Sequence, residues 1–179
     1  MAELSGQGPI LFHGATTTVD SAAGQKLGVH GFDTEGNEYV YVDFQSSMAA
    51  GEWVVFDSAF AATAIATTSR GWVGVVISTV SASDRYGWVM VRGTHSAAWV
   101  TSDSSLGPPV VGTTEPGPGA IASPASGTGG VAVWGVAVTG TNTSGTTATT
   151  SVTGTSVLAT TMVYLNYPFI TGAVGQVTS

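Results

Sequence analysis

The stretch that decides the fold is "GFDTEGNEYVYVDF", residues 31–44. Its second half alternates: Val40, Val42 and Phe44 fall on one face of an extended chain, and two tyrosines and an aspartate fall on the other. This period of two is typical of a half-buried β-strand. Just before it, Gly36-Asn37 supplies residues that tolerate the positive φ angles of a tight turn. The stretch therefore predicts a β-hairpin with its tip at residues 35–37.

The same stretch holds four carboxylates, Asp33, Glu35, Glu38 and Asp43. Such a cluster can form a metal site or an acid–base pair, or it can be the solvated surface of a hairpin. The ligand spacing of an EF-hand calcium loop is missing. Acid–base pairs also need burial or mutual coupling to shift their pKa values, whereas turn carboxylates are usually solvated. We therefore expect these carboxylates to be solvated hairpin residues.

Further strand patterns occupy most of the remaining chain. β-branched and aromatic runs bounded by Gly, Ser or Asp occur at residues 52–58, 71–80, 86–93, 131–140 and 162–170. Residues 71–93 resemble a second hairpin, and Pro168 is expected at a sheet edge or a strand end. These patterns predict an all-β protein, a small antiparallel β-barrel or sandwich with a C-terminal β-strand arm.

The expected organisation has four parts. Residues 1–20 form an N-terminal arm, and residues 21–103 form the barrel or sandwich domain. Five of the seven prolines fall between residues 104 and 130, which predicts a Pro/Gly-rich linker that carries no regular strand ladder. Residues 131–179 form a C-terminal β region, which includes a threonine-rich piece at 139–156 that propensity assigns to neither a loop nor a strand.

Charge is scarce and unevenly distributed. Only 8% of the 179 residues are charged, the net charge is −7, and the chain has four basic residues, too few for a phosphate-binding surface. Nucleic acid is therefore not an expected partner. The chain has no cysteine and no apolar run long enough to span a membrane, so neither disulfides nor a membrane partner is expected.

Residues 116–179 contain no Asp, Glu, Lys or Arg. Charge normally keeps exposed strands from associating, so a strand region without it is expected to be covered in a permanent assembly. We expect a homo-oligomer, with a trimer favoured. The expected interface residues are the aromatic side chains Trp72, Trp88, Trp99, Trp134, Tyr164, Tyr167 and Phe169.

Trp72 and Trp88 stand in two copies of a Gly-Trp-Val motif, at residues 71–73 and 87–89. They can be a carbohydrate-stacking pair or packed residues of a core or an interface, and packing is the commoner role. Both are therefore expected to be mostly buried, in the barrel core or between subunits.

Motifs of catalysis and cofactor binding are missing from the sequence. His13, His30 and His95 are scattered, no nucleophile elbow is present, and no glycine-rich loop follows a strand and opens a helix. The expected protein is not an enzyme and needs no cofactor.

Residues 22–44 and 48–58 resemble the opening of head decoration proteins of tailed bacteriophages, also called capsid cement proteins. The shared features are a Leu-Gly segment, a turn with glycine, and the strand "EYVYV". "RGWVGVVISTVSASDRYGWVMVRG" (70–93) is similar to a hairpin of that family, and "YLNYPF" (164–169) is similar to the end of other virion proteins. The resemblance implies a trimer on the outer surface of the capsid, with the major capsid protein as its partner.

Two alternatives stay open from the sequence. A tail-fibre or receptor-binding module, which binds carbohydrate, would also explain the threonine-rich tail and the exposed aromatic residues. A hydrolytic fibre domain would need a buried pair of carboxylates, which the sequence does not display.

Overall fold

The computed structural model describes residues 10–11, 19–66, 69–101, 110–112, 121–122, 131–139 and 158–173. Its strands are β1 (Ile10–Leu11), β2 (His30–Phe32), β3 (Glu38–Phe44), β4 (Trp53–Phe56), β5 (Ala61–Ala64), β6 (Gly71–Val76), β7 (Tyr86–Thr101), β8 (Val110–Gly112), β9 (Ile121–Ala122), β10 (Val131–Val138) and β11 (Leu158–Ala173). The described residues form no helix. The prediction of an all-β protein is confirmed.

The hairpin at the opening stretch is formed by β2 and β3. His30 pairs with Val40 and Phe32 with Glu38 in an antiparallel register. The turn between them is closed by a hydrogen bond from the backbone N–H of Asp33 to the carbonyl of Asn37, and Gly36 has a φ of 83°. An L side chain rarely adopts that angle, so glycine suits the tip. The hairpin follows directly from the sequence.

Five strands follow one another around a ring, in the order β3–β5–β4–β6–β7 and back to β3. Two of the links are short. The parallel β3–β5 link and the antiparallel β6–β7 link each join two residue pairs. The sheet is therefore mixed but mostly antiparallel, and it forms a partial ring rather than the regular barrel that the sequence analysis allowed.

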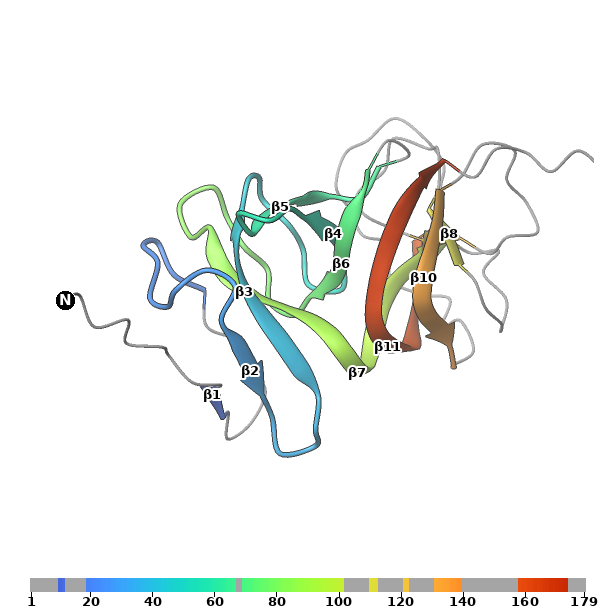
Figure 1. Ribbon diagram of the computed structural model, residues 1–179, viewed down its shortest axis with the longest axis horizontal. Coiled ribbons are helices and arrows are strands. Elements are labelled where there is room, and N and C mark those ends of the chain that lie inside the picture. Colours follow the sequence, from blue (N-terminus) through green and yellow to red (C-terminus); the bar gives the residue numbers. More distant parts are fainter. Residues whose placement is uncertain are drawn as a thin grey trace, which may run out of the picture.

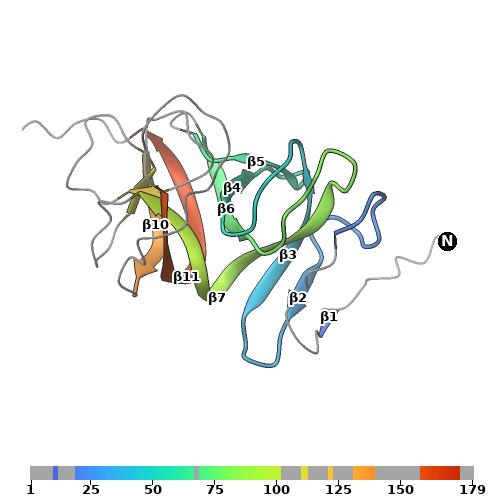
Figure 2. The same cartoon turned by 180° about the vertical axis from the view of Figure 1, so that it is seen from behind.

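The C-terminal strands are folded onto this ring within the same chain (Figures 1 and 2). The second half of β7 leaves the ring and pairs with β11, from Arg92–Asn166 to Thr101–Leu158. β11 then pairs with the start of β6, and along its length it also pairs with β10. β7 and β11 thereby join residues of the N-terminal half to residues of the C-terminal half in one sheet.

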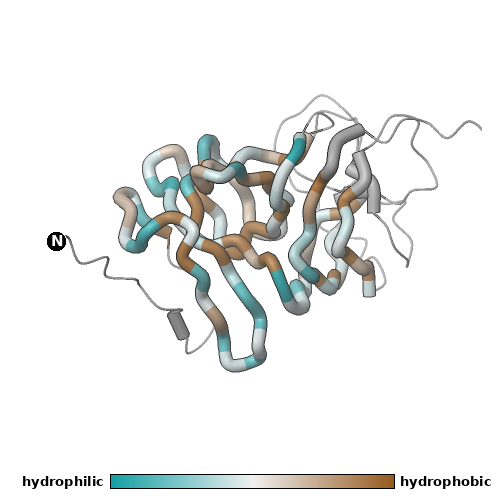
Figure 3. Tube along the Cα trace, viewed as in Figure 1, coloured by the Kyte–Doolittle hydropathy of each residue, from teal (hydrophilic) through white to brown (hydrophobic). Residues whose placement is uncertain are grey.

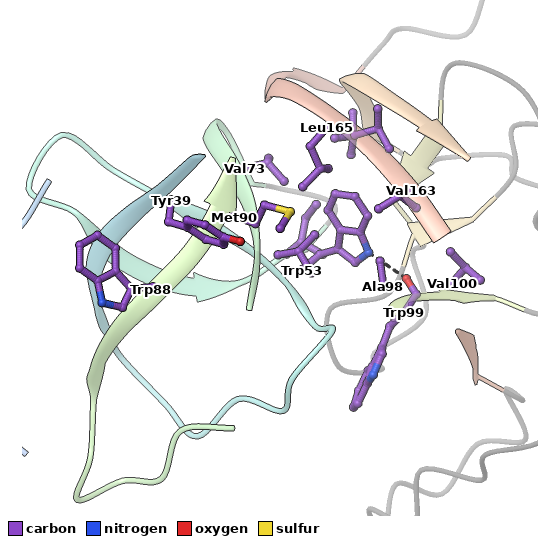
Figure 4. Close-up of a cluster of buried hydrophobic side chains, with 14 of the residues drawn as sticks. Tyr39, Trp53, Val73, Trp88, Met90, Ala98, Trp99, Val100, Val163 and Leu165 are labelled. Carbon is purple, nitrogen blue, oxygen red and sulfur yellow. Dashed lines mark hydrogen bonds between the residues drawn. The ribbon is translucent and has the colours of Figure 1, made fainter. Parts of the chain in front are cut away.

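Two cores result from this arrangement. The ring encloses a first cluster, made of the buried apolar side chains Val40, Val42, Phe44, Met48, Val54, Phe56, Ala62, Val76, Val80, Val89 and Val91. A second cluster joins the outer wall of the ring to β10 and β11, with Trp53 fully buried in it (Figure 4). The indole N–H of Trp53 donates to the carbonyl of Trp99 at 2.9 Å, which ties β4 to β7. Figure 3 shows hydrophobic colour along many of these strand segments.

Two local expectations were wrong. Pro168 lies neither at an edge nor at a strand end: it is buried inside β11, at an irregularity of the β10–β11 register. A missing backbone N–H is tolerated there because the ladder is already interrupted. Residues 110–112 and 121–122 form β8 and β9 inside the expected linker, which was predicted to carry no ladder. The rest of that linker and residues 140–156 lie outside the described residues.

Candidate interaction surface

The large apolar side chains that stay exposed are concentrated on three neighbouring strands. Among the described residues they are Trp72, Trp134, Met162, Tyr164, Tyr167 and Phe169, each between 40% and 57% exposed. One belongs to β6, one to β10 and four to β11. We call these six residues the apolar face. Contiguous exposed apolar surface of this kind usually marks a site of interaction.

Strand alternation explains why these side chains point outward. On β11, Val163, Leu165 and Ile170 are buried in the second core cluster, so the residues between them face away from it. The same holds on β10, where Val133 is buried and Trp134 is exposed. The apolar face is thus the outer side of strands whose inner side closes the core.

Three of the six residues form a row across the strands. Phe169 of β11 is paired with Trp72 of β6 on one side and with Trp134 of β10 on the other. Directly opposed residues share a face of a sheet and lie about 5 Å apart at Cβ. We call Trp72, Phe169 and Trp134 the aromatic row. It places three large rings side by side on one surface, from segments far apart in the sequence.

Five of the seven sequence-predicted interface residues belong to the apolar face, and two do not. Trp88 and Trp99 are buried within the chain, 5% and 9% exposed. Trp88 packs edge-on against Tyr41, with ring centroids 5.0 Å apart. Trp72 is 57% exposed in the isolated chain and Trp88 is buried, so the two do not form an exposed sugar-stacking pair. Burial of Trp72 between subunits stays a prediction. Met162 was not among the predicted interface residues. Its neighbour Val163 is buried, and strand alternation therefore points the side chain of Met162 outward.

Few charges border the apolar face. β10 and β11 contain no charged residue. Arg70 precedes β6, and Arg92 on β7 is paired with Asn166 of β11. The carboxylate of Glu38 also reaches the face, in a chain with a net charge of −7.

A buried carboxylate supports one end of the face. The hydroxyl of Tyr167 donates to Glu38 Oε2 at 2.5 Å, and His30 Nδ1 lies 2.5 Å from Glu38 Oε1. This hydrogen bond to Glu38 raises the pKa of Tyr167. Tyr167 has a φ of 48°, which is uncommon for a residue with a side chain, and its bond to Glu38 helps to hold that conformation.

The prediction of solvated carboxylates is therefore wrong for Glu38, which is 4% exposed. Burial follows from β11 lying over this end of the hairpin, a long-range contact that the local sequence does not encode. Asp43 is half-buried and binds Arg85 through both carboxylate oxygens, at 2.5 and 2.7 Å. Glu35 is exposed, as expected.

Asp33 organises the turn. It accepts hydrogen bonds from the backbone N–H groups of Glu35 and Asn37, the side-chain amide of Asn37 and the hydroxyl of Tyr39, at 2.7–2.9 Å. The pKa of Asp33 is lowered: burial acts to raise it, and the four hydrogen bonds together outweigh burial. All four donors belong to residues of the hairpin, so the Asp33 carboxylate stabilises the hairpin.

No metal or membrane element emerges from the described part of the chain. It holds no group of three or more His, Cys, Asp or Glu residues placed to bind a metal ion. Nor does it hold a helix long and apolar enough to cross a membrane. Two further titratable groups are perturbed: burial lowers the pKa of His95 to about 4 and raises the pKa of Glu52.

Comparison of the chain with models of protein families, with curated proteins and with solved structures found no match.

Proposed function

We propose that this chain is a structural virion protein that binds the outer surface of a tailed-phage capsid and stabilises the shell. The observation that carries the proposal is the apolar face: six large side chains left exposed on uncharged strands. A surface of this composition suits permanent burial in an assembly. The sequence resemblance to capsid cement proteins supplies the kind of assembly.

The proposed mechanism is additive binding. Each copy clamps neighbouring major capsid proteins through ordinary interface burial, and the symmetry of the shell multiplies the contribution. The described geometry fits a protein that binds without catalysing a reaction. Its clustered carboxylates form hydrogen bonds within the hairpin and to Tyr167 of β11. No catalytic residue and no cofactor enter the proposal.

The aromatic row favours one second candidate, a carbohydrate-binding receptor module of a tail fibre. Exposed aromatic rings are platforms on which sugar rings stack, and three of them lie side by side here. This candidate predicts glycan binding by the isolated chain and a few copies per particle. The cement proposal predicts capsid binding and a copy number comparable to that of the capsid protein.

Co-sedimentation tests the proposal. The purified chain is mixed with empty capsids assembled from the major capsid protein of the same genome, and the pellet and the capsid disruption temperature are measured. We expect saturable binding and a higher disruption temperature. No binding to capsids, together with binding on a glycan array, would favour the receptor module instead.

A further inference from the structure

We propose that the apolar face is the contact between copies of this chain, so that the aromatic rows of neighbouring subunits pack together about a symmetry axis. This inference deepens the proposed function, on which its role in a virion rests. It assigns the apolar face to a second copy of the chain, as the contact between subunits within the assembly of the proposed function.

The exposed area of the apolar face suits an interface between two copies. Large aromatic side chains offer roughly 150–250 Å² each when fully exposed. At 40–57% exposure, the six residues of the apolar face present roughly 400–670 Å² per copy. Two such faces would bury roughly 800–1,300 Å² together, a range that includes the ~1,000 Å² that a specific interface needs. The apolar face is therefore of the size of a small specific interface between two copies.

The distribution of charge also favours a second copy as the partner. Every charged residue of the chain precedes residue 116, and the net charge is −7, so two copies repel each other over most of their surfaces. β10 and β11 carry no charge, and among the described residues Arg70, Arg92 and the buried Glu38 lie near the apolar face. Copies that meet through this face bring their uncharged strands together. An identical neutral face is thus a complementary partner.

The aromatic row is held firmly by the strands around it. Phe169 is anchored on both sides by paired strands, and the neighbouring Tyr167 is fixed to Glu38. A surface held in one conformation loses little entropy on association. The apolar face is therefore pre-organised for a partner of fixed shape, such as another copy.

Sedimentation velocity on the full-length chain at micromolar concentration tests the inference. We expect an oligomer for the unmodified chain. Trp134→Glu places a charge in the aromatic row and should weaken self-association at least tenfold. The matched control is Thr63→Glu, which adds the same charge at an exposed position of β5 and should leave the oligomer unchanged. Trp134→Phe keeps an apolar ring in the row and should also assemble.

Each outcome decides between the alternatives. A stable monomer of the unmodified chain, or an unchanged oligomer of Trp134→Glu, would overturn the inference. If circular dichroism shows that Trp134→Glu has lost its fold, Trp72→Glu repeats the test from β6, where the side chain is 57% exposed. Capsid co-sedimentation is measured separately. An oligomer that does not bind capsids contradicts the proposed function alone. A monomer that binds capsids contradicts this inference alone.

Discussion

At the scale of single residues, the carboxylates of the opening stretch have different roles although they are close in sequence. Glu35 is exposed, Asp33 caps the turn, and Glu38 is buried beneath Tyr167. The sequence predicts the turn because glycine suits the positive φ angle at its tip, which Gly36 adopts. It does not predict the burial of Glu38, because that depends on a residue more than a hundred positions away.

The Glu38–Tyr167 contact gives a first prediction. Tyr167→Phe removes the hydroxyl that donates to a buried carboxylate, so the free energy of unfolding should fall by about 1–3 kcal/mol. Urea denaturation measures the change. Tyr164→Phe is the matched control: it is on the same strand, is similarly exposed, and should change stability by less than ~0.5 kcal/mol. Equal effects of the two substitutions would contradict the role given to Glu38.

His95 gives a second prediction, on pH. Its Nδ1 accepts the backbone N–H of Ala97, and burial lowers its pKa to about 4 from 6.5. Protonation is thus less favourable in the folded chain than in the unfolded chain. The stability that the neutral ring contributes is complete above pH 6.5 and is lost as the pH falls toward 4, at up to ~1.4 kcal/mol per pH unit.

Melting curves of the unmodified chain and of His95→Gln between pH 7 and 4 measure this effect. Glu52, whose pKa is raised by burial, acts in the opposite direction over part of this range, so the difference between the two proteins is the relevant quantity. The unmodified chain should lose more stability on acidification than the variant. Parallel curves would show that His95 does not contribute.

At the scale of elements, the strands were predictable and their partners were not. Alternation and β-branched residues identified β3, β4, β6, β7, β10 and β11 from local sequence. The full length of β7 and the switch of β11 from β7 to β6 arise from long-range pairing. The two Gly-Trp-Val motifs show the limit most clearly: one tryptophan packs on Tyr41 inside the molecule, and the other belongs to the aromatic row.

The bend in β7 gives a third prediction. Gly93 has a φ of 110°, and a Cβ there would overlap the side-chain oxygen of Asn37, which accepts the N–H of Thr94. Gly93→Ala should therefore cost more than ~2 kcal/mol, from backbone strain and the loss of this bond. Gly36→Ala is the control, because its φ is also positive but its Cβ would meet open space. Thermal unfolding should show a clearly smaller loss for Gly36→Ala.

At the scale of the whole molecule, charge and hydrophobicity are divided between two parts of the chain. Residues 1–115 carry all the charge, and the strands of residues 131–139 and 158–173 present most of the exposed apolar side chains. The sequence predicted this division and five of the six residues of the apolar face. These residues lie on one surface because β11 pairs with both β6 and β10. We propose that this surface joins copies of the chain on a capsid.

The copy number per virus particle tests the proposed role most directly. Under the proposed function, virus particles of the encoding phage are purified and separated on a denaturing gel, and the band of the chain is compared with that of the major capsid protein by densitometry. The cement role predicts a copy number of the same order as that of the capsid protein. A few copies per particle, as in a tail fibre, or none at all, would contradict it.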